Sequence, residues 1–156
     1  MGAYGLLTMY NLELKIGVSK TGAPTATWTY AELANGIDNV SEALNETVQQ
    51  YFFLSDDGFA RNHVTGMAPS FTLTGRRVIG DQAQDYIFGT KYSLDTERQT
   101  SIQLSYTDAE GATVTYTCDA TLCNIQEWSG ATTDDSAISF EVRLDGKPTS
   151  AKTPAD

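Results

Sequence analysis

The sequence predicts a mainly β protein of two packed antiparallel sheets, forming a β-sandwich or a partly open barrel, with one short α-helix. Three observations predict this fold: alternating apolar and polar segments recur, turn signals separate them, and one segment has helical periodicity. The chain has 156 residues, 40% of them hydrophobic, which is enough for one domain with a substantial core. We expect a single domain over residues 1–148 and a flexible, polar C-terminal tail over residues 149–156.

Several segments alternate with period two, as strands with one buried face do. The last of them places Ile138, Phe140, Val142 and Leu144 on one side. Residues 108–111 read Asp-Ala-Glu-Gly, a turn that joins two of the segments into a hairpin. The expected strands cover residues 10–18, 26–30, 71–74, 102–106, 114–118 and 138–144.

The predicted helix covers residues 81–88. Asp81 has a side chain suited to cap its N-terminus, and Gly89 is suited to end it. Ala83 and Ile87 are four residues apart, so they lie on one helical face and are expected to pack against a sheet.

The pattern of residues 37–65 is mixed. Val40, Leu44, Val48 and Tyr51 suit one helical face, but Asn45, Thr47 and the aromatic run at residues 51–54 argue against a helix. We expect a long extended segment, called the arm below, with ordered ends. The alternative is a core strand at residues 51–54, Tyr-Phe-Phe-Leu, with an ordinary surface loop on either side. Both hold if such a strand anchors the arm.

The residue inventory argues against catalysis and against metal or cofactor binding. His63 is the single histidine, and two cysteines with one histidine cannot complete a zinc site. Asp56, Asp57 and Gly58 lack the alternating oxygen ligands of a calcium loop and are read as a turn. We therefore predict no catalytic, cofactor or metal residues, and we expect Cys118 and Cys123 to be reduced thiols.

Charge and hydropathy narrow the function further. The net charge is −10, from 10 basic and 20 acidic residues. Without a basic cluster the chain is a poor candidate for holding nucleic acid, because neutralising phosphates supplies most such affinity. No apolar run approaches about 18 residues, so no membrane span is predicted.

Three segments, in this order and spacing, resemble siphophage major tail tube proteins. The central one, residues 66–89, combines a strand, a tight turn and a helix of the Gly-Asp-x-Ala-Gln-Asp-Tyr type. Residues 51–59 with 64–66 match upstream, and residues 138–148, with their Gly-Lys-Pro exit, match downstream. Gln82 departs from the proline often found before the helix alanine, a residue that only pre-sets the first helical turn.

The resemblance implies a structural virion protein and not an enzyme. In that family two packed antiparallel sheets are flanked by a helix, and subunits form hexameric rings that stack into a hollow tube through which phage DNA passes without specific binding. The implied partners are other copies of the chain, a tape measure protein inside the tube, and tail-tip (initiator) and terminator proteins at its ends. The implied location is the virion tail, assembled in the host cytoplasm.

The resemblance also implies which residues meet a neighbouring subunit. The arm reaches the neighbour, and the polar outer face of the sheet, rich in Thr, Ser and acids, lines the channel. An acidic lining would repel DNA phosphates. The predicted inter-subunit residues are Asn39, Val40, Ser41, Leu44, Tyr51, Phe52, Asp56, Asp57 and Phe59.

Two other functions stay open at this stage. One is a tube subunit of an effector-delivery or injection system, which shares the wall fold. The other is a β-sandwich receptor-binding or head-decoration module, which would stay a monomer or trimer.

Overall fold

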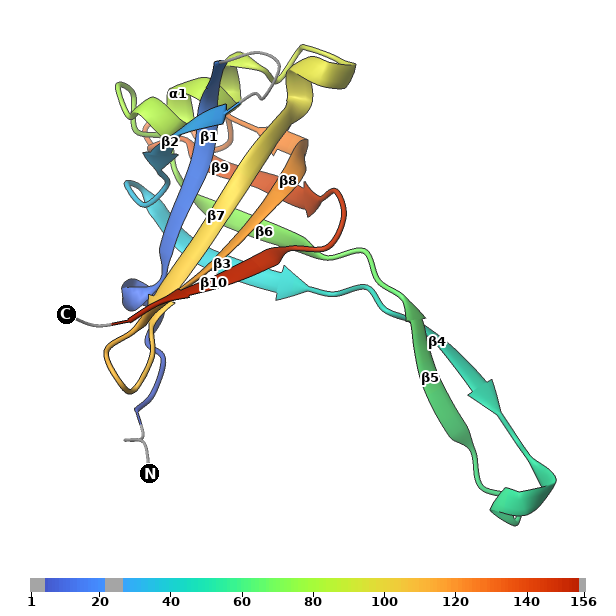
Figure 1. Cartoon of the computed structure of the whole chain (residues 1–156). Helices are drawn as coiled ribbons and strands as arrows, with labels where there is room; N and C mark the ends of the chain where they lie inside the picture. The colour runs from blue at the N-terminus through green and yellow to red at the C-terminus, as the bar shows by residue number, and fades with distance from the viewer. Residues whose placement is uncertain (1–4, 22–26, 155–156) are drawn as a thin grey trace.

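The computed structural model describes residues 5–21 and 27–154. Within these ranges the chain is mainly β with one α-helix and an open, sandwich-like arrangement, so the predicted fold class is confirmed (Figure 1). Ala26, predicted to begin the second strand, and the last two residues of the predicted tail lie outside the described ranges. None of the described helices has the length and apolar character needed to cross a membrane.

All six predicted strands are present. The first was predicted to begin at residue 10 but begins at Glu13, because Met9–Asn11 forms a 3-10 helix. The strands are β1 (Glu13–Thr21), β2 (Thr27–Glu32), β3 (Ile37–Ala43), β4 (Thr47–Tyr51), β5 (Arg61–Gly66), β6 (Ser70–Arg76), β7 (Gln99–Thr107), β8 (Thr113–Gln126), β9 (Ala137–Leu144) and β10 (Thr149–Thr153). The helix α1 covers Gln82–Gly89, and short 3-10 helices cover Met9–Asn11, Leu54–Asp56 and Asp95–Arg98.

Eight of the strands form one antiparallel sheet that folds over itself at β8. Its order is β2-β1-β7-β8-β9-β6-β3, and β10 also pairs with β8. We call β2, β1, β7, β8 and β10 the first layer, and β8, β9, β6 and β3 the second layer. In Figure 1 the strands of the second layer cross behind β1 and β7, so the long strand β8 serves both layers.

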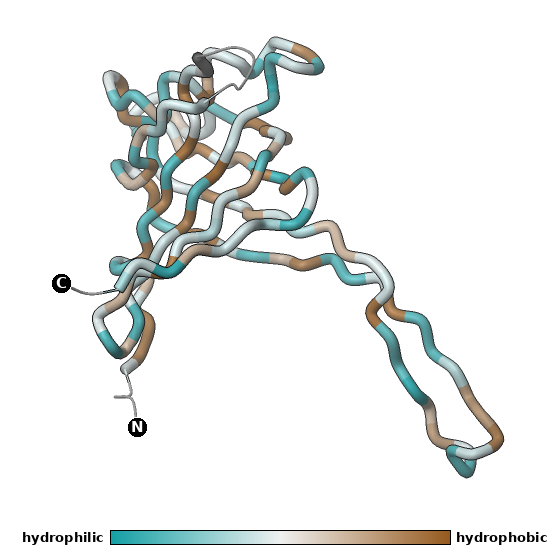
Figure 2. Tube along the Cα trace, in the orientation of Figure 1, coloured by the Kyte–Doolittle hydropathy of each residue, from teal (hydrophilic) through white to brown (hydrophobic). Residues whose placement is uncertain are grey.

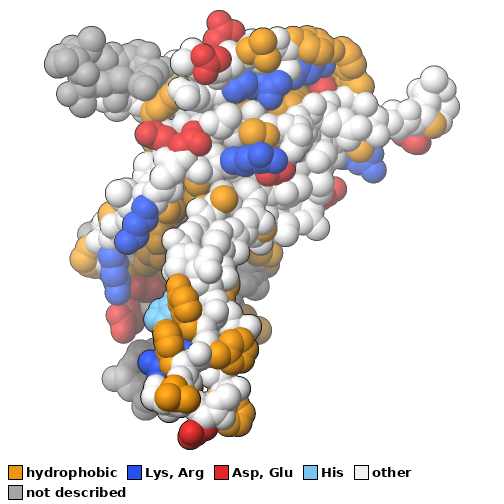
Figure 3. All heavy atoms as spheres, turned by 90° about the vertical axis from the view of Figure 1, so that its right-hand side faces the viewer, with side chains coloured by type: hydrophobic (Ala, Val, Ile, Leu, Met, Phe, Trp, Pro, Cys, Tyr) orange, Lys and Arg blue, Asp and Glu red, His pale blue; other side chains and the backbone are white. Residues whose placement is uncertain are grey.

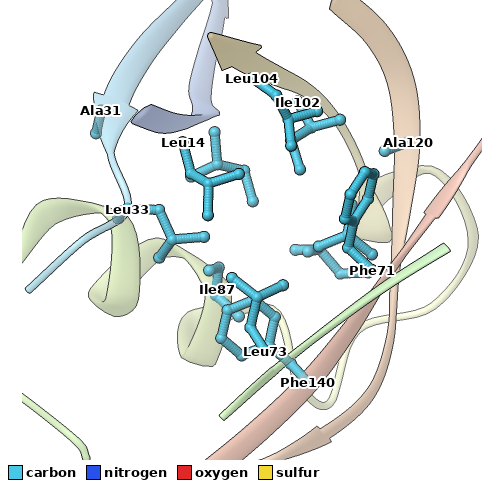
Figure 4. Close-up of a cluster of buried hydrophobic side chains, with 14 of the residues drawn as sticks. Leu14, Ala31, Leu33, Phe71, Leu73, Ile87, Ile102, Leu104, Ala120 and Phe140 are labelled. Carbon is cyan, nitrogen blue, oxygen red and sulfur yellow. The ribbon is translucent and has the colours of Figure 1, made fainter. Parts of the chain in front are cut away.

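The core lies between the two layers, where the apolar residues of each alternating strand meet (Figure 4). Phe140 of β9, Leu73 of β6 and Ile102 of β7 are at most 1% exposed. The ring of Phe88 in α1 meets that of Phe140 edge-on, with 6.2 Å between ring centroids. Burial of such large side chains contributes about 1.5–3 kcal/mol each.

The helix α1 forms where predicted, because its N-terminal cap and its apolar face both favour a helix at these residues. An Asp81 carboxylate oxygen accepts a hydrogen bond from the backbone N–H of Gln84 at 3.1 Å. Ala83 and Ile87 are both fully buried. Gln84 is also buried, and its side-chain amide bonds Val78 N, Asn35 O and Arg76 O, which ties the helix to the turn before β3 and to the segment that follows β6.

The region predicted as an arm divides into two parts. Residues 37–43 form β3, the edge strand of the second layer, paired with β6. Residues 47–66 contain β4 and β5, which pair only with each other and project from the body as a hairpin (Figure 1). The alternative of a core strand at residues 51–54 is wrong, since Tyr51, Phe52, Phe53 and Leu54 are all exposed.

The C-terminal segment differs from the predicted flexible tail. Thr149–Thr153 forms β10, antiparallel to β8, with Thr149 opposite Thr117 and Thr153 opposite Thr113. Hydropathy missed this strand because all five of its residues are exposed and polar or small. Backbone pairing along an otherwise open edge of β8 is sufficient to order it.

Candidate functional site

The hairpin of β4 and β5 carries apolar side chains that have no core to enter. All residues of β4, and all of β5 except Gly66, are exposed. In Figure 2 the trace of this projection is coloured hydrophobic towards its tip and base, and Figure 3 shows apolar side chains gathered on it. Its exposed large apolar residues are Val48, Tyr51, Phe52, Phe53, Leu54, Phe59 and Val64. Because an isolated two-stranded hairpin is marginally stable in water, this exposure makes the hairpin a candidate interaction surface.

One face of the hairpin is aromatic. Tyr51 stacks on Phe53 with 5.5 Å between ring centroids, and His63 meets the Tyr51 ring edge-on at 5.8 Å. The guanidinium of Arg61 lies 5.9 Å from the Phe53 ring centroid. The opposite face pairs Val48 with Val64. The two faces therefore offer different surfaces to a neighbour.

The hairpin tip is a compact turn. Asp57 and Gly58 both have positive φ, 51° and 86°, which reverses the chain between the two strands. Arg61 Nη2 lies 2.7 Å from Asp56 Oδ1 and closes the turn. Phe52, Leu54 and Phe59 surround it at 66%, 100% and 76% exposure. In the described ranges no group of three or more His, Cys, Asp or Glu residues could hold a metal ion.

The outer face of the first layer is a second feature. One row of paired residues crosses it from Glu32 through Lys15, Gln103 and Thr117 to Thr149. Hydroxyl side chains dominate this face, which we call the hydroxyl face. Its hydroxyl residues are Ser101 and Ser105, which are buried, and the more exposed Thr107, Thr113, Thr115, Thr117, Thr149 and Thr153.

Charge on the hydroxyl face is low. Among the described residues its charged side chains are Glu13, Lys15, Glu32 and Asp119. Three acids and one lysine give −2, against −10 for the whole chain. Most acids lie elsewhere, and Glu141 is on the second layer with Arg143 2.6 Å away. This face therefore presents hydroxyl groups more than the acids that the composition suggested.

The third feature is the free edges of the first layer. Among described strands, β2 pairs on one side only, with β1, and β10 pairs on one side only, with β8. The second layer has one such edge, β3. Unpaired edges present backbone N–H and C=O groups to other chains, so they are the natural places for strand pairing between subunits.

A cleft of about 680 Å³ opens between the layers near the base of the hairpin. Leu44 and Met67, which flank the hairpin, line it together with Val40, Leu104 and Tyr116. Its lining is largely apolar, which makes the hairpin base a continuation of the apolar surface of the tip.

A partly buried charge network holds the end of the sandwich near α1. Glu127 accepts from Arg77 Nε at 2.8 Å and from Lys91 Nζ at 2.5 Å, and Arg77 also pairs with Asp85 at 2.8 Å. Partial burial acts to raise the pKa of Glu127, but hydrogen bonds from Arg77 and Lys91 outweigh it, so the pKa is lowered. Each of these partners is paired within the subunit, so the network is structural.

The structure separates the predicted inter-subunit residues into two groups. Asn39, Val40 and Ser41 belong to β3, the edge of the second layer, and Leu44 follows that strand. Tyr51, Phe52, Asp56, Asp57 and Phe59 lie on the hairpin and its tip. Sequence reasoning missed Val48, Phe53, Leu54, Arg61 and Val64. For Phe53 and Leu54 the signal was the apolar run at residues 51–54, just before the Asp-Asp-Gly turn.

Neither a family model nor a curated protein sequence matches the chain. Solved structures do. The cap that terminates the tube of the anti-feeding prophage (AFP) superposes with a TM-score of 0.61 and 13% identity, covering 98% of this chain and 95% of that one. A chain from the sheath–tube complex of the extracellular contractile injection system PVC superposes with a TM-score of 0.58 and 13% identity. The match covers 94% of this chain and 91% of that one.

A third similar structure is the tail of an empty GTA particle, with a TM-score of 0.61 and 11% identity, covering 92% of this chain and 98% of that one. The TM-scores show a shared fold. At identities this low, the function has to be inferred from the residues and geometry of this chain. The chain therefore has a fold that occurs in tube, tube-cap and tail structures of phage-like particles.

Proposed function

We propose that this protein is the major tube subunit of a tail. Copies join side by side into rings, and the rings stack into a hollow tube. The observation that carries the proposal is that the first layer has two free edges and a polar outer face. A sheet with two free edges can continue from one subunit to the next, and six copies can close it into a barrel around a channel.

A ring of six is supported by the similar structures. The GTA tail has C6 symmetry, and the AFP baseplate, which has a TM-score of 0.56 to this chain, is six-fold symmetrised. In such a ring the hydroxyl face lines the channel. The second layer and α1 then form the outer wall.

Stacking uses the hairpin. Because the β4–β5 hairpin extends away from the sandwich, it reaches beyond its own subunit to a neighbour (Figure 1). Phe52 and Phe59 at its tip, with Tyr51 and Phe53 on its aromatic face, become buried there. Every ring repeats the contact, so individually weak contacts sum to a stable joint.

We infer further that the tube belongs to a long, non-contractile phage tail and conducts DNA. A hydroxyl-rich lining of low charge suits a polyanion that must pass without being held. Its partners are then a tape measure protein inside the tube, initiator proteins at the tail tip and a terminator at the other end. The protein forms the wall of the tail tube and performs no catalysis. The tail is assembled in the host cytoplasm.

A second candidate is a tube that delivers effector proteins. The likeness to a chain of the PVC sheath–tube complex favours it, since that structure is a contractile injection system. In both candidates the subunits form rings that stack into a tube. They differ in the cargo that passes through the tube, and only the injection-system tube is surrounded by a sheath.

Negative-stain electron microscopy of the purified protein at low and high concentration tests the proposal. Hollow rings or tubes of uniform width are expected. Discrete monomers or trimers at every concentration would contradict the tube and favour a receptor-binding or decoration module. Adding purified candidate sheath protein separates the two tube types, because only the injection-system tube should acquire a coat.

A further inference from the structure

The C-terminal strand β10 occupies an edge that ring closure needs. Along one side of β8, residues Ala120–Gln126 pair with β9 and Thr113–Thr117 pair with β10. The other side of β8 is taken by β7. Without β10, residues 113–117 would be an open edge of the first layer, opposite the open edge of β2.

Strand direction decides whether two subunits can pair with β10 in place. Each neighbouring pair in the order β2-β1-β7-β8-β10 is antiparallel. Five alternating strands leave the two outermost, β2 and β10, running in the same direction. In a ring whose subunits are related by rotation about its axis, β10 of one copy would therefore meet β2 of the next in parallel.

Removing β10 changes this relation. The outermost strands are then β2 and β8, which run in opposite directions, so the joint between copies becomes antiparallel and the closed barrel becomes antiparallel throughout. Antiparallel pairing is slightly more stable per residue, and purely antiparallel sheets are over-represented among known sheets. The lengths also agree: β10 covers five residues of β8, and β2 has six.

We propose that β10 is a removable guard strand: on assembly it leaves β8, and β2 of a second copy takes its place along Thr113–Thr117. This inference rests on the proposed tube function. It assigns the ring interface to two named edges, and it makes the exchange of β10 for a neighbour's β2 the step that converts monomer into ring.

The contacts that hold β10 are weak enough to be exchanged. All five of its residues are exposed, so its departure uncovers little core. Besides the backbone ladder, Thr149 Oγ1 donates to Thr117 O at 3.2 Å and Lys152 Nζ lies 3.2 Å from Asp108 Oδ2. Exposed ion pairs of this kind contribute little. The linker contains Gly146 at φ 107°, with open space around its Cβ position, so it can act as a hinge.

The guard also covers the ring-forming edge of β8 in the monomer. An uncovered edge at residues 113–117 would pair with any available strand. A short polar strand of the same chain covers it at high effective concentration, and a correctly placed neighbour can displace it.

A reversible lock tests the exchange. Thr115 and Ala151 are Cα partners across β8 and β10. The double variant Thr115→Cys/Ala151→Cys, in a Cys118→Ser/Cys123→Ser background, can tie the strands with a disulfide. The matched control locks Gln99→Cys to Thr121→Cys, partners across β7 and β8 that lie outside the exchanged segment and stay paired in the ring. Assembly is followed by light scattering and negative-stain microscopy, oxidised and reduced.

The expected result is loss of rings and tubes for the oxidised β8–β10 lock and their return on reduction, while the β7–β8 lock assembles in both states. Equal assembly of the oxidised and reduced β8–β10 locks overturns the guard and leaves the tube proposal standing. Absence of rings and tubes from the unmodified protein and from every variant overturns the tube proposal itself, and the inference with it.

A truncation gives an independent reading. Ending the chain after Pro148 removes β10, and we expect assembly at a protein concentration at least tenfold lower than for the full chain. Circular dichroism of the dilute monomer shows whether it remains folded. A folded, truncated monomer that assembles no better than the full chain contradicts the inference.

Discussion

Gly75 of β6 lies so close to Gly36 that a Cβ on Gly75 would come within 2.0 Å of the Gly36 carbonyl oxygen. The same oxygen accepts a hydrogen bond from Arg76 N at 2.7 Å. Gly36 has a φ of 78°, in the left-handed region that glycine favours. This contact sets where β3 begins beside β6, and β3 leads directly into the projecting hairpin.

Replacing Gly75 with alanine should therefore destabilise the monomer. The new methyl group meets backbone, which cannot move aside without shifting β3, and overpacking of this kind costs about 1–3 kcal/mol or more. Urea unfolding at neutral pH measures the change. Gly89→Ala is the matched control, because nothing lies within 4 Å of its Cβ position at the end of α1. Equal stability of the two variants would show that the close approach is absent.

Glu127→Gln should lower stability by about 2 kcal/mol, because it leaves Arg77 and Lys91 as neighbouring positive charges without their carboxylate. The effect depends on pH. The pKa of Glu127 is lowered in the folded state, so its stabilisation is present above the ordinary glutamate pKa of about 4.3 and is lost as pH falls through the folded value. Unfolding experiments from pH 7 downwards should show wild type and variant converging only under acid conditions.

The control for Glu127 is Glu110→Gln. Glu110 is 66% exposed and lies 3.9 Å from its partner Lys152, so its substitution should change stability by at most about 0.5 kcal/mol. A difference at pH 7 between Glu127→Gln and wild type no larger than this would show that the network contributes nothing.

Replacing Phe52, Leu54 and Phe59 together with serine should abolish stacking and leave the monomer intact. These side chains touch no core, so monomer stability should change by about 0.5 kcal/mol or less. Sedimentation and electron microscopy measure assembly. Gln49→Ser, an exposed polar change on the same hairpin, should assemble normally. Tubes of ordinary length from the triple variant would exclude the tip from the joint.

Gln103 lies in the middle of the hydroxyl face, so it should point into the channel. A Gln103→Cys variant should react with a bulky maleimide as a monomer and resist it in tubes, because a narrow channel excludes the large reagent. A small maleimide should react in both states. Asp134→Cys, in an exposed loop, is the control and should react with either reagent throughout. Unchanged bulky labelling at position 103 after assembly would place the hydroxyl face on the outside.

The sequence predicted those elements whose local pattern and burial agree. Alternation located most of the sandwich strands, and the Asp81 cap with the Ala83–Ile87 face located α1. It underestimated β8, whose 14 residues run past a register shift between Cys123 and Gln126. A single alternating pattern does not extend across such an irregularity.

Edge and arm strands were harder to predict because their pairing depends on backbone and not on burial. In β3 only Ile37 and Val40 are half-buried, so its pattern is faint. In β10 no residue is buried. On the hairpin, hydropathy does not predict burial. Phe53 and Leu54 suggest a core strand by their hydropathy, yet they face solvent in the monomer. Apolar residues that are buried by a neighbouring molecule have the same hydropathy in the sequence as those that are buried in the core.

The central claim is that the first layer closes into the wall of a hollow tube. Cryo-electron microscopy of the assembled protein, with helical reconstruction, tests it most directly. The account predicts a continuous β wall with an open channel, and the row Lys15–Gln103–Thr117 on its inner surface. A filled filament, or a tube with that row on its outer surface, would contradict it.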